Sequence, residues 1–357
     1  MLQRLRLYYA SHERGAAVGF FTAGFLFDML TLGRIDSWLV IGQQIVYLGV
    51  ILLVLLQLFL EQGESAPQPR WYSRYRTALV HFLLGALLNL YTLFFFKSSS
   101  LLVSFFFLAF LVILLLANES ALFKSRGLAF KFALLSLCLL SFFAALVPVL
   151  VGSLGLAVFL LSMLVGCLPL ASAAAWIRRA APALFPRARK QILAPLGGVL
   201  VGFLAFYLFR LIPPVPLSVP FIGVYHGVER TEQGYRLSHE RPPWRVWHNG
   251  DQQFAAQPGD KVHVYFRVFS PTSFSDQVLL RWYRKGERWT LQDTIPIRIV
   301  GGREAGFRGY GVKTHYQPGR WKVQVETTDG REIGRVYFDL KTRPDAMPRS
   351  FTSDLDA

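Results

Sequence analysis

The hydrophobic pattern of the sequence changes at residues 212–220, which read Ile212-Pro213-Pro214-Val215-Pro216-Leu217-Ser218-Val219-Pro220. No helix continues through this run, because proline lacks an amide hydrogen and its ring clashes with the preceding turn. Long apolar stretches precede the run and short alternating stretches follow it. The sequence therefore predicts a helical domain over residues 1–212 and an all-β domain over residues 221–341.

Two further segments are expected to lie outside these domains. Closely spaced prolines favour an extended and fairly stiff chain. We therefore expect residues 213–220 to be a spacer that holds the all-β domain away from the helical one. The tail 342–357 is polar and lies at a chain terminus, where order is often lost. We expect this tail to be disordered.

The first half is long and apolar enough to cross a membrane several times. A membrane-spanning helix needs roughly 20 apolar residues. The chain is 53% hydrophobic and only 17% charged, whereas soluble globular chains carry about 25% charged residues. We therefore expect a transmembrane bundle of about seven helices, although six or eight would also fit. The stretches are 16–33, 38–60, 78–96, 101–117, 129–150, 155–177 and 192–212.

The net charge of +16 is a signal of membrane topology and not of nucleic-acid binding. Short loops rich in Lys and Arg stay in the cytoplasm. Only Arg34 and Lys97 lie in one set of alternate loops, and the other set, with the N-terminus, holds 14 cations. The pattern predicts a cytoplasmic N-terminus, an uncleaved signal anchor and an all-β domain across the membrane. The 14 are Arg4, Arg6, Arg14, Arg70, Arg74, Arg76, Lys124, Arg126, Lys131, Arg178, Arg179, Arg187, Arg189 and Lys190.

Apolar and polar residues alternate through most of the second half. Turn residues such as Pro258-Gly259-Asp260 and Asp329-Gly330 separate the alternating stretches. Six or seven short strands at this spacing predict an antiparallel, immunoglobulin-like β-sandwich. We expect its core to include Val262, Val264, Phe266, Val268, Val278, Leu280, Trp282, Ile295, Ile297, Ile299, Trp321, Val323, Val325, Val336, Phe338 and Leu340, with His263, Tyr265 and Arg267 facing away from it.

Several short motifs lie within residues 277–340. They are Arg281-Trp282, Ile295-Pro296-Ile297, Gly301-Gly302-Arg303, Gly306-Phe307-Arg308-Gly309, Pro318-Gly319-Arg320-Trp321 and Gly334-Arg335. With these motifs the segment resembles a bacterial envelope domain family of unknown function. The helical half, with its proline junction, looks like the companion membrane region of proteobacterial members. The resemblance implies an inner-membrane protein with a periplasmic domain, and it implies no reaction, ligand or catalytic residue.

The sequence carries none of the common enzyme motifs HExxH, CxxC, GxSxG and GxxxxGK[ST]. Cys138 and Cys167 lie in apolar stretches, so the all-β domain has no disulfide framework. Five of the seven histidines lie in that domain, but their spacing puts no pair of metal ligands on one strand face. We therefore expect no catalysis, no metal and no other cofactor.

Aromatic and arginine side chains are the candidate ligand-binding groups of the all-β domain. Tyr283 and Trp289 alternate outward or lie beside a turn, and exposed rings of this kind stack on sugars. Arg303 and Arg308, on a Gly-rich segment, can present guanidinium groups to phosphate or carboxylate. The alternative is a β-bulge whose charges discourage pairing between sheet edges.

Polar residues within the apolar stretches are the candidates for a pathway through the membrane. We single out Asp28, Gln43 and Asn89, because polar groups in this setting often have a function. The alternative is ordinary hydrogen bonding between helices. No relay of acidic residues and histidines runs along the stretches, which disfavours an ion pump.

Together, these patterns favour a membrane-anchored envelope protein whose sandwich binds a periplasmic protein or glycan. The alternative is a transporter, or a component that translocates lipid or glycolipid, with the sandwich as an accessory domain. A membrane enzyme is a third and weaker interpretation. We expect contact with the lipid bilayer, oligomerisation of like or unlike chains through the helices, and no nucleic-acid partner.

Overall fold

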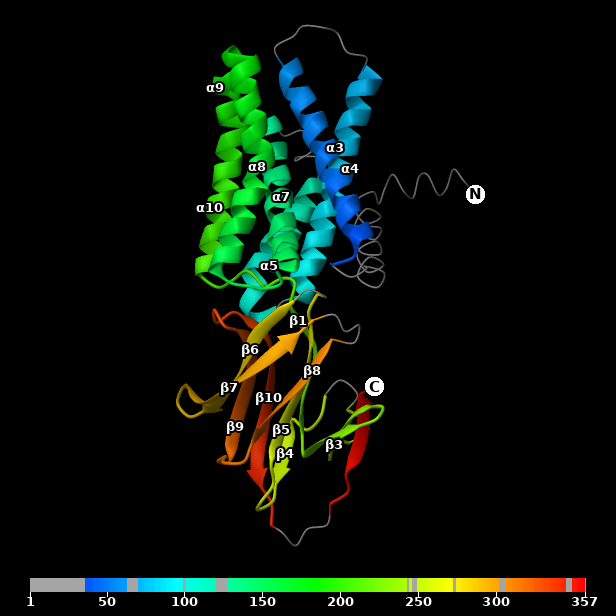
Figure 1. Ribbon diagram of the computed structural model, residues 1–357, viewed down its shortest axis with the longest axis vertical. Helices are drawn as coiled ribbons and strands as arrows, with labels where there is room; N and C mark the ends of the chain where they lie inside the picture. The colour runs from blue at the N-terminus through cyan, green and yellow to red at the C-terminus, as the bar shows by residue number, and fades with distance from the viewer. Residues whose placement is uncertain are drawn as a thin grey trace, which may run out of the picture.

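The computed structural model describes residues 36–62, 70–98, 101–119, 127–242, 244–245, 249–271, 274–301, 306–344 and 349–356. These residues form a helical part followed by a β-rich part, stacked along the long axis of the molecule (Figure 1). The helices are α3 (Trp38–Glu61), α4 (Arg70–Lys97), α5 (Leu101–Glu119), α7 (Leu128–Val151), α8 (Leu156–Ala180), α9 (Phe185–Ala188) and α10 (Ala194–Leu208), with a 3₁₀ turn η1 (Pro182–Leu184) and a π turn η2 (Arg189–Leu193) around α9.

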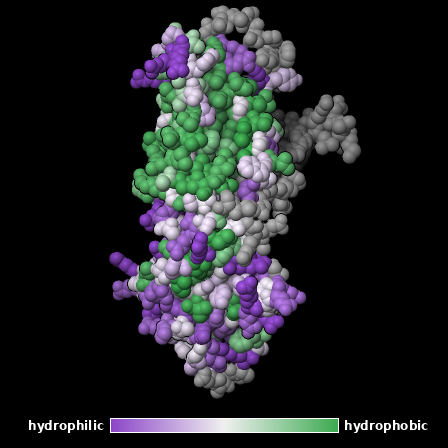
Figure 2. All heavy atoms as spheres, viewed as in Figure 1, coloured by the Kyte–Doolittle hydropathy of each residue, from purple (hydrophilic) through white to green (hydrophobic). Residues whose placement is uncertain are grey.

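Within the described residues, five helical segments are long and apolar enough to span a membrane, namely Trp38–Glu61, Tyr75–Lys97, Leu128–Val151, Leu156–Ala180 and Pro182–Leu208. Large apolar side chains are exposed on their outer faces, and they form a broad hydrophobic belt in Figure 2. Such a belt is typical of a surface that contacts lipid. These features indicate a membrane protein.

The helices follow the predicted apolar stretches closely. The five long segments contain most of the stretches 38–60, 78–96, 129–150, 155–177 and 192–212, and α5 covers 101–117. The last spanning segment, Pro182–Leu208, starts earlier than the predicted residue 192 and ends at Leu208, five residues before Pro213. The first predicted stretch, 16–33, lies outside the described residues.

The β-rich part contains three sheets. The five-stranded sheet has the order β4-β10-β9-β6-β7, the first three-stranded sheet the order β1-β5-β8, and the second the order β11-β3-β2. All neighbours pair antiparallel except β4 and β10, which pair parallel. The strands are β1 (Ser218–Tyr225), β2 (Gly227–Thr231), β3 (Gly234–His239), β4 (Gln253–Ala256), β5 (Val262–Phe269), β6 (Ser275–Lys285), β7 (Trp289–Val300), β8 (Phe307–Lys313), β9 (Gly319–Thr327), β10 (Glu332–Thr342) and β11 (Thr352–Asp356).

The main core of the β-rich part lies between the five-stranded sheet and the sheet β1-β5-β8. Alternate residues of β5, β6, β9 and β10 point into it, which confirms the predicted pattern. Trp282 and Trp321 are both buried there, as expected. Phe338 stacks on Trp321 with ring centroids 6.4 Å apart. Apolar burial of this size is the main stabilising contribution in a domain without disulfides.

The small sheet β11-β3-β2 covers the other face of β5, which the alternation predicted to be polar. Tyr265 faces away from the main core, as expected, but it is not exposed: it is buried with Tyr225 and Leu237 in a second, smaller core. The predicted disorder of the tail is also wrong for residues 352–356, because they form β11 and pair with β3. The reason is that β11 is held by charge pairs, which apolar periodicity does not reveal.

The proline-rich segment is buried between the two parts, so the expected free spacer is not formed. Residues 213–217 are all buried. Val215 packs into the core of the helical bundle, and Leu217, two residues later, packs into the core of the β-rich part. Leu154, from the turn between α7 and α8, also packs against the β core. As predicted, no helix runs through the prolines, and the apolar residues Val215 and Leu217 pack the two parts against each other.

Polar contacts fasten the junction on both sides of this segment. The hydroxyl of Tyr207, in α10, donates a hydrogen bond to Asp329 Oδ2 at 2.9 Å, and Arg331 Nε lies 2.9 Å from the same oxygen. The guanidinium of Arg331 also lies over the Tyr207 ring. Burial alone would raise the pKa of Asp329, but the charge of Arg331 and the hydrogen bonds hold it below its usual value. Asp276 accepts a hydrogen bond from the Leu154 amide at 3.0 Å.

We predict that Asp329→Asn loosens this junction. Losing a charged, half-buried hydrogen-bond acceptor costs about 1–3 kcal/mol, so local opening should become roughly fivefold to a hundredfold more frequent. Hydrogen exchange of the solubilised full chain, followed by mass spectrometry, should be faster over residues 211–217 and 327–331. Asp339→Asn is the matched control, because that exposed carboxylate lies on β10 away from the helices. Equal exchange in the two variants would contradict the prediction.

Candidate ligand-binding site

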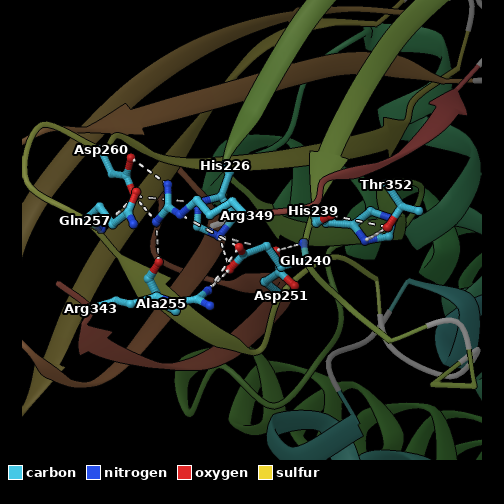
Figure 3. A network of polar contacts seen from close by, with 10 residues as sticks. All are labelled: His226, His239, Glu240, Asp251, Ala255, Gln257, Asp260, Arg343, Arg349 and Thr352. Atoms are coloured by element: carbon cyan, nitrogen blue, oxygen red, sulfur yellow. Dashed lines mark hydrogen bonds and ion pairs between the residues drawn. The ribbon is translucent and has the colours of Figure 1, made fainter. Parts of the chain in front are cut away.

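Ionisable side chains from distant parts of the sequence meet at the end of the β-rich part farthest from the helices. Strand β1 begins at the junction and runs away from it, so His226, which follows β1, lies near the far end. The end of β10 and the start of β11 reach the same region. Figure 3 shows the resulting network, which joins His226 to Glu240, Asp251, Asp260, Arg343 and Arg349.

The imidazole of His226 lies at the centre of three carboxylates and is only 5% exposed. Its Nε2 is 3.6 Å from Asp251 and 3.8 Å from Glu240, and its Nδ1 is 3.9 Å from Asp260. The ring stacks on Phe254 with centroids 3.9 Å apart. Neither ring nitrogen has a hydrogen-bond partner among the residues that the structure describes. The ring is thus held by stacking and burial, with acidic groups just beyond hydrogen-bond distance.

Two arginines neutralise the carboxylates around this histidine. Arg349 donates hydrogen bonds to both oxygens of Asp260, at 3.1 and 2.6 Å, and to the carbonyl of Ala255 at 2.7 Å. Arg343 lies 3.2 Å from Glu240 Oε1. Such bidentate and charge-assisted contacts are among the stronger hydrogen bonds in proteins. Glu240 and Asp260 therefore have cationic partners, whereas Asp251 has no arginine at ion-pair distance among the described residues.

Asp251 is positioned by the backbone. Its amide donates to the Val224 carbonyl at 2.7 Å, and its carboxylate accepts from the Glu240 amide at 2.8 Å. The preceding Gly250 has a φ of 69°, and a Cβ there would lie 2.0 Å from the Val224 oxygen. Only glycine fits this close approach. Gly250 thereby allows the chain to bring Asp251 against the His226 ring.

Burial shifts the pKa values of Asp251 and His226 in directions that favour their neutral forms. Burial raises the pKa of Asp251 to about 6, and burial together with the charge of Arg349 lowers the pKa of His226 to about 4. For Asp260, burial alone would raise the pKa, but the hydrogen bond from Arg349 brings it below the usual value. The network therefore combines two ion pairs, Glu240–Arg343 and Asp260–Arg349, with two groups, Asp251 and His226, whose charged forms are disfavoured by burial.

A pocket of about 360 Å³ opens beside this network. Its lining is strongly polar and includes three guanidinium groups, two carboxylates, two amides and a serine hydroxyl. Cationic groups converging on one concavity favour an anionic ligand. The residues are Glu240, Arg241, Pro242, Arg245, Gly250, Asp251, Gln252, Gln253, Arg343 and Ser350.

The wall of the pocket is tied to the C-terminal strand. Asp354, in β11, lies 3.3 Å from Arg241 and 3.1 Å from the ring of the buried His239. Arg245 lies over the Trp244 ring at 4.8 Å. In the described part of the chain, no three His, Cys, Asp or Glu side chains could together hold a metal ion. The arrangement is suited to binding an anion through guanidinium groups.

The structure brings together only part of the patch expected from the sequence. Tyr283 and Trp289 lie near each other on the outer face of the five-stranded sheet, where Lys322 Nζ is 4.3 Å from the first ring and 5.2 Å from the second. Arg308 lies on β8, in the other main sheet, because the chain changes sheets between β7 and β8. Arg303 lies outside the described residues.

Arg308 does bind a carboxylate, but one from its own chain. Its Nε lies 3.5 Å from Asp356, the last residue of β11. Asp356 also pairs with Arg267 at 3.2 Å and accepts a hydrogen bond from Tyr265. Arg308 therefore contacts a carboxylate, and this contact helps to hold the C-terminal strand β11 in place.

The polar residues singled out within the apolar stretches are dispersed. Gln43, on α3, donates to the Tyr47 hydroxyl at 2.9 Å on an exposed face of the helix. Asn89 is half-buried within α4, and Asp28 lies outside the described residues. Neither Gln43 nor Asn89 lines the small cavity at the junction between the two parts. The predicted pathway stays without structural support at these positions.

We predict opposite pH responses from Asp251→Asn and His226→Gln. Since the pKa of Asp251 is raised, the native protein binds this proton more tightly than the unfolded chain, which adds stability as the pH falls through about 6. Since the pKa of His226 is lowered, the unfolded chain binds that proton more tightly, which removes stability between about pH 6.5 and pH 4. In the native chain the two effects oppose each other.

Asp251→Asn should therefore lose more stability than the native chain on acidification from pH 6.5 to 4, and His226→Gln should lose less. The measurement is the thermal midpoint of the β-rich part in the solubilised full chain, followed by tryptophan fluorescence. Asp339→Asn, which changes an exposed carboxylate, should keep the native pH profile. Parallel profiles for Asp251→Asn and His226→Gln would show the reasoning to be wrong.

Comparison with known proteins identifies a domain but no activity. Residues 275–340 match the family described as "Protein of unknown function (DUF2914)", which confirms the expected C-terminal domain of unknown function. The match runs from the start of β6 to near the end of β10. It includes Tyr283 and Trp289 but not His226 or the pocket beside it. No curated protein matches the chain.

Proposed function

We propose that this chain is a membrane-anchored binding protein of the bacterial cell envelope, and that its β-rich part holds an anionic saccharide. The observation that carries the proposal is the pocket of about 360 Å³ lined by Arg241, Arg245 and Arg343. Its volume lies within the range of small-molecule sites, which is roughly 300–1,000 Å³. No catalytic role is proposed for it.

The other polar groups of the pocket suit a sugar. Gln252, Gln253 and Ser350 line the same walls, and amide and hydroxyl groups both donate to and accept from sugar hydroxyls. The guanidinium groups suit a carboxylate or phosphate on the sugar, because their planar N–H forks match these anions. A saccharide that carries one such acidic group would use both kinds of partner.

The two carboxylates of the pocket offset only part of the positive charge of its three guanidinium groups. Glu240 is already paired with Arg343 and lies 3.7 Å from Arg349. Burial raises the pKa of Asp251 to about 6, so a nearby anion can be accommodated by proton uptake on this residue. Arg245 forms no ion pair with any carboxylate that the structure describes, and it is the cation most available to a ligand.

The distribution of charge supports a cytoplasmic N-terminus and a periplasmic β-rich part. The basic cluster at the end of α8 and through η2 lies at the opposite end of the helices from the β sheets (Figure 2). Lys and Arg residues favour the cytoplasmic side of a membrane. In this orientation, the inner membrane of a bacterium would anchor the protein and the pocket would open toward the periplasm.

We predict that Arg245→Gln weakens binding of an acidic sugar. The full chain in detergent would be titrated with galacturonic acid, glucose 6-phosphate and neutral glucose, and its thermal midpoint recorded. Binding to the native state alone raises this midpoint as ligand is added. Loss of one charged hydrogen-bond partner, worth about 1.5–3 kcal/mol, should weaken binding roughly tenfold to a hundredfold.

Arg236→Gln is the matched control, because this exposed arginine on β3 pairs with Glu229 and does not line the pocket. Its ligand response should equal that of the native chain. Neutral glucose should leave the midpoint unchanged. If neither acidic sugar raises the midpoint, or if Arg245→Gln responds like the native chain, the proposed function is wrong.

A further inference from the structure

A second group of side chains lies on the outer face of the five-stranded sheet, on strands that do not contribute to the pocket. We call Tyr283, Trp289, Lys322 and Tyr337 the aromatic face. Each is half-buried, so part of each side chain is open to solvent. Trp289 and Tyr337 have ring centroids 5.9 Å apart at an interplanar angle of 52°. Lys322 Nζ lies 4.3 Å from the Tyr283 ring and 5.2 Å from the Trp289 ring.

Strand register explains why these residues meet. The neighbouring residues Trp282 and Val323 point into the core, so Tyr283 and Lys322 must point outward. Lys322 is paired with Tyr283 on β6 and with Tyr337 on β10. Trp289 is the first residue of β7, and its ring lies beside both Tyr337 and Lys322. The face is thus built from four strands of one sheet.

Cations surround the aromatic face. Lys285 Nζ lies 5.6 Å from the Trp289 ring, and the Arg320 guanidinium lies 5.9 Å from the Tyr337 ring. Lys285, Arg320 and Lys322 form no ion pair with a carboxylate in the described part of the chain. Burial, followed by the charge of Arg335, lowers the pKa of Lys322, as expected for a cation without its own counterion.

Two acidic residues next to Lys322 on the same face are already neutralised. Glu326 is buried, lies 3.1 Å from Arg281 and accepts a hydrogen bond from Tyr283 at 3.5 Å. Glu332 is buried and pairs with Arg335. The surface around Tyr283 and Lys322 therefore presents aromatic rings and cations, while Glu326 and Glu332 are covered. Asp339, exposed and opposite Arg320 in the strand register, is the acidic residue at its edge.

We infer that the aromatic face is a binding surface for an acidic polysaccharide. The faces of pyranose rings are apolar enough to pack on Tyr and Trp rings, and the acidic groups of such a chain would meet Lys285, Arg320 and Lys322. Charge complementarity favours an acidic over a neutral chain. The inference does not rest on the distal pocket, because the two sites share no residue.

The test uses the full chain in detergent and an oligogalacturonate as the probe. A malto-oligosaccharide of the same length supplies sugar rings without charge, and polyglutamate supplies charge without sugar rings. Binding would be measured by calorimetry in a background of Arg245→Gln, in which any binding at the distal pocket is weakened. Oligogalacturonate should bind more tightly than either comparison polymer.

Two variants then separate the contributions of the face. Trp289→Ala removes the central ring, and Lys322→Gln removes the central charge but keeps all three rings. Each should weaken oligogalacturonate binding roughly tenfold. Lys341→Gln, an exposed lysine farther along β10, should bind like the parent. Because Lys322→Gln leaves the apolar contacts intact, it stays informative even if Trp289→Ala disturbs the hairpin.

Three results would overturn the inference. The first is no binding of oligogalacturonate by the parent chain. The second is unchanged affinity in Lys322→Gln. The third is polyglutamate binding as tightly as oligogalacturonate, which would identify a surface that recognises charge alone. Failure of the pocket proposal leaves this test unaffected, because every protein in it already carries Arg245→Gln.

Discussion

The half-buried carboxylate of Asp329 is the polar contact that joins the two parts. It accepts a hydrogen bond from Tyr207 at the end of α10 and pairs with Arg331 in the β-rich part. A partly desolvated charge of this kind is stabilised only while its partners stay in place. Together with the packing of Val215 and Leu217, it fixes the β sheets directly against the ends of the helices. The far end of the sheets, with its pocket, is therefore held at a defined distance from the apolar belt.

The distal site also depends on carboxylates that need a cationic partner. Three carboxylates surround His226, and the chain offsets their mutual repulsion with Arg343 and Arg349. Asp251 lacks such a partner among the described residues, and its pKa is raised to about 6 by burial. A network that leaves one carboxylate without a cation is less stable than a fully paired one. Perturbed groups beside a polar pocket are a common feature of functional sites.

Much of the fold, but little of the distal site, could be predicted from the sequence. Apolar length identified the helices, and alternation identified core residues such as Trp282 and Trp321, because both patterns are local. The site is assembled from His226, Asp251 and Arg349, which lie far apart in the chain and meet only through sheet topology. The burial of Tyr265 and the order of β11 were missed for a related reason. Both depend on the covering sheet, whose charge pairs leave no periodic signal.

The C-terminal strand links the distal site to the rest of the β-rich part. Ser350 lines the pocket, Asp354 pairs with Arg241 in its wall, and Asp356 pairs with Arg308 on β8. Undocking this segment would therefore remove one wall of the pocket and break the hydrogen bond between Asp356 and Tyr265, a residue of the second core. By thermodynamic linkage, a ligand that binds only the intact pocket must also stabilise the docked strand. Because the strand is held by ion pairs and only a few apolar contacts, that stabilisation should weaken as salt screens its exposed pairs.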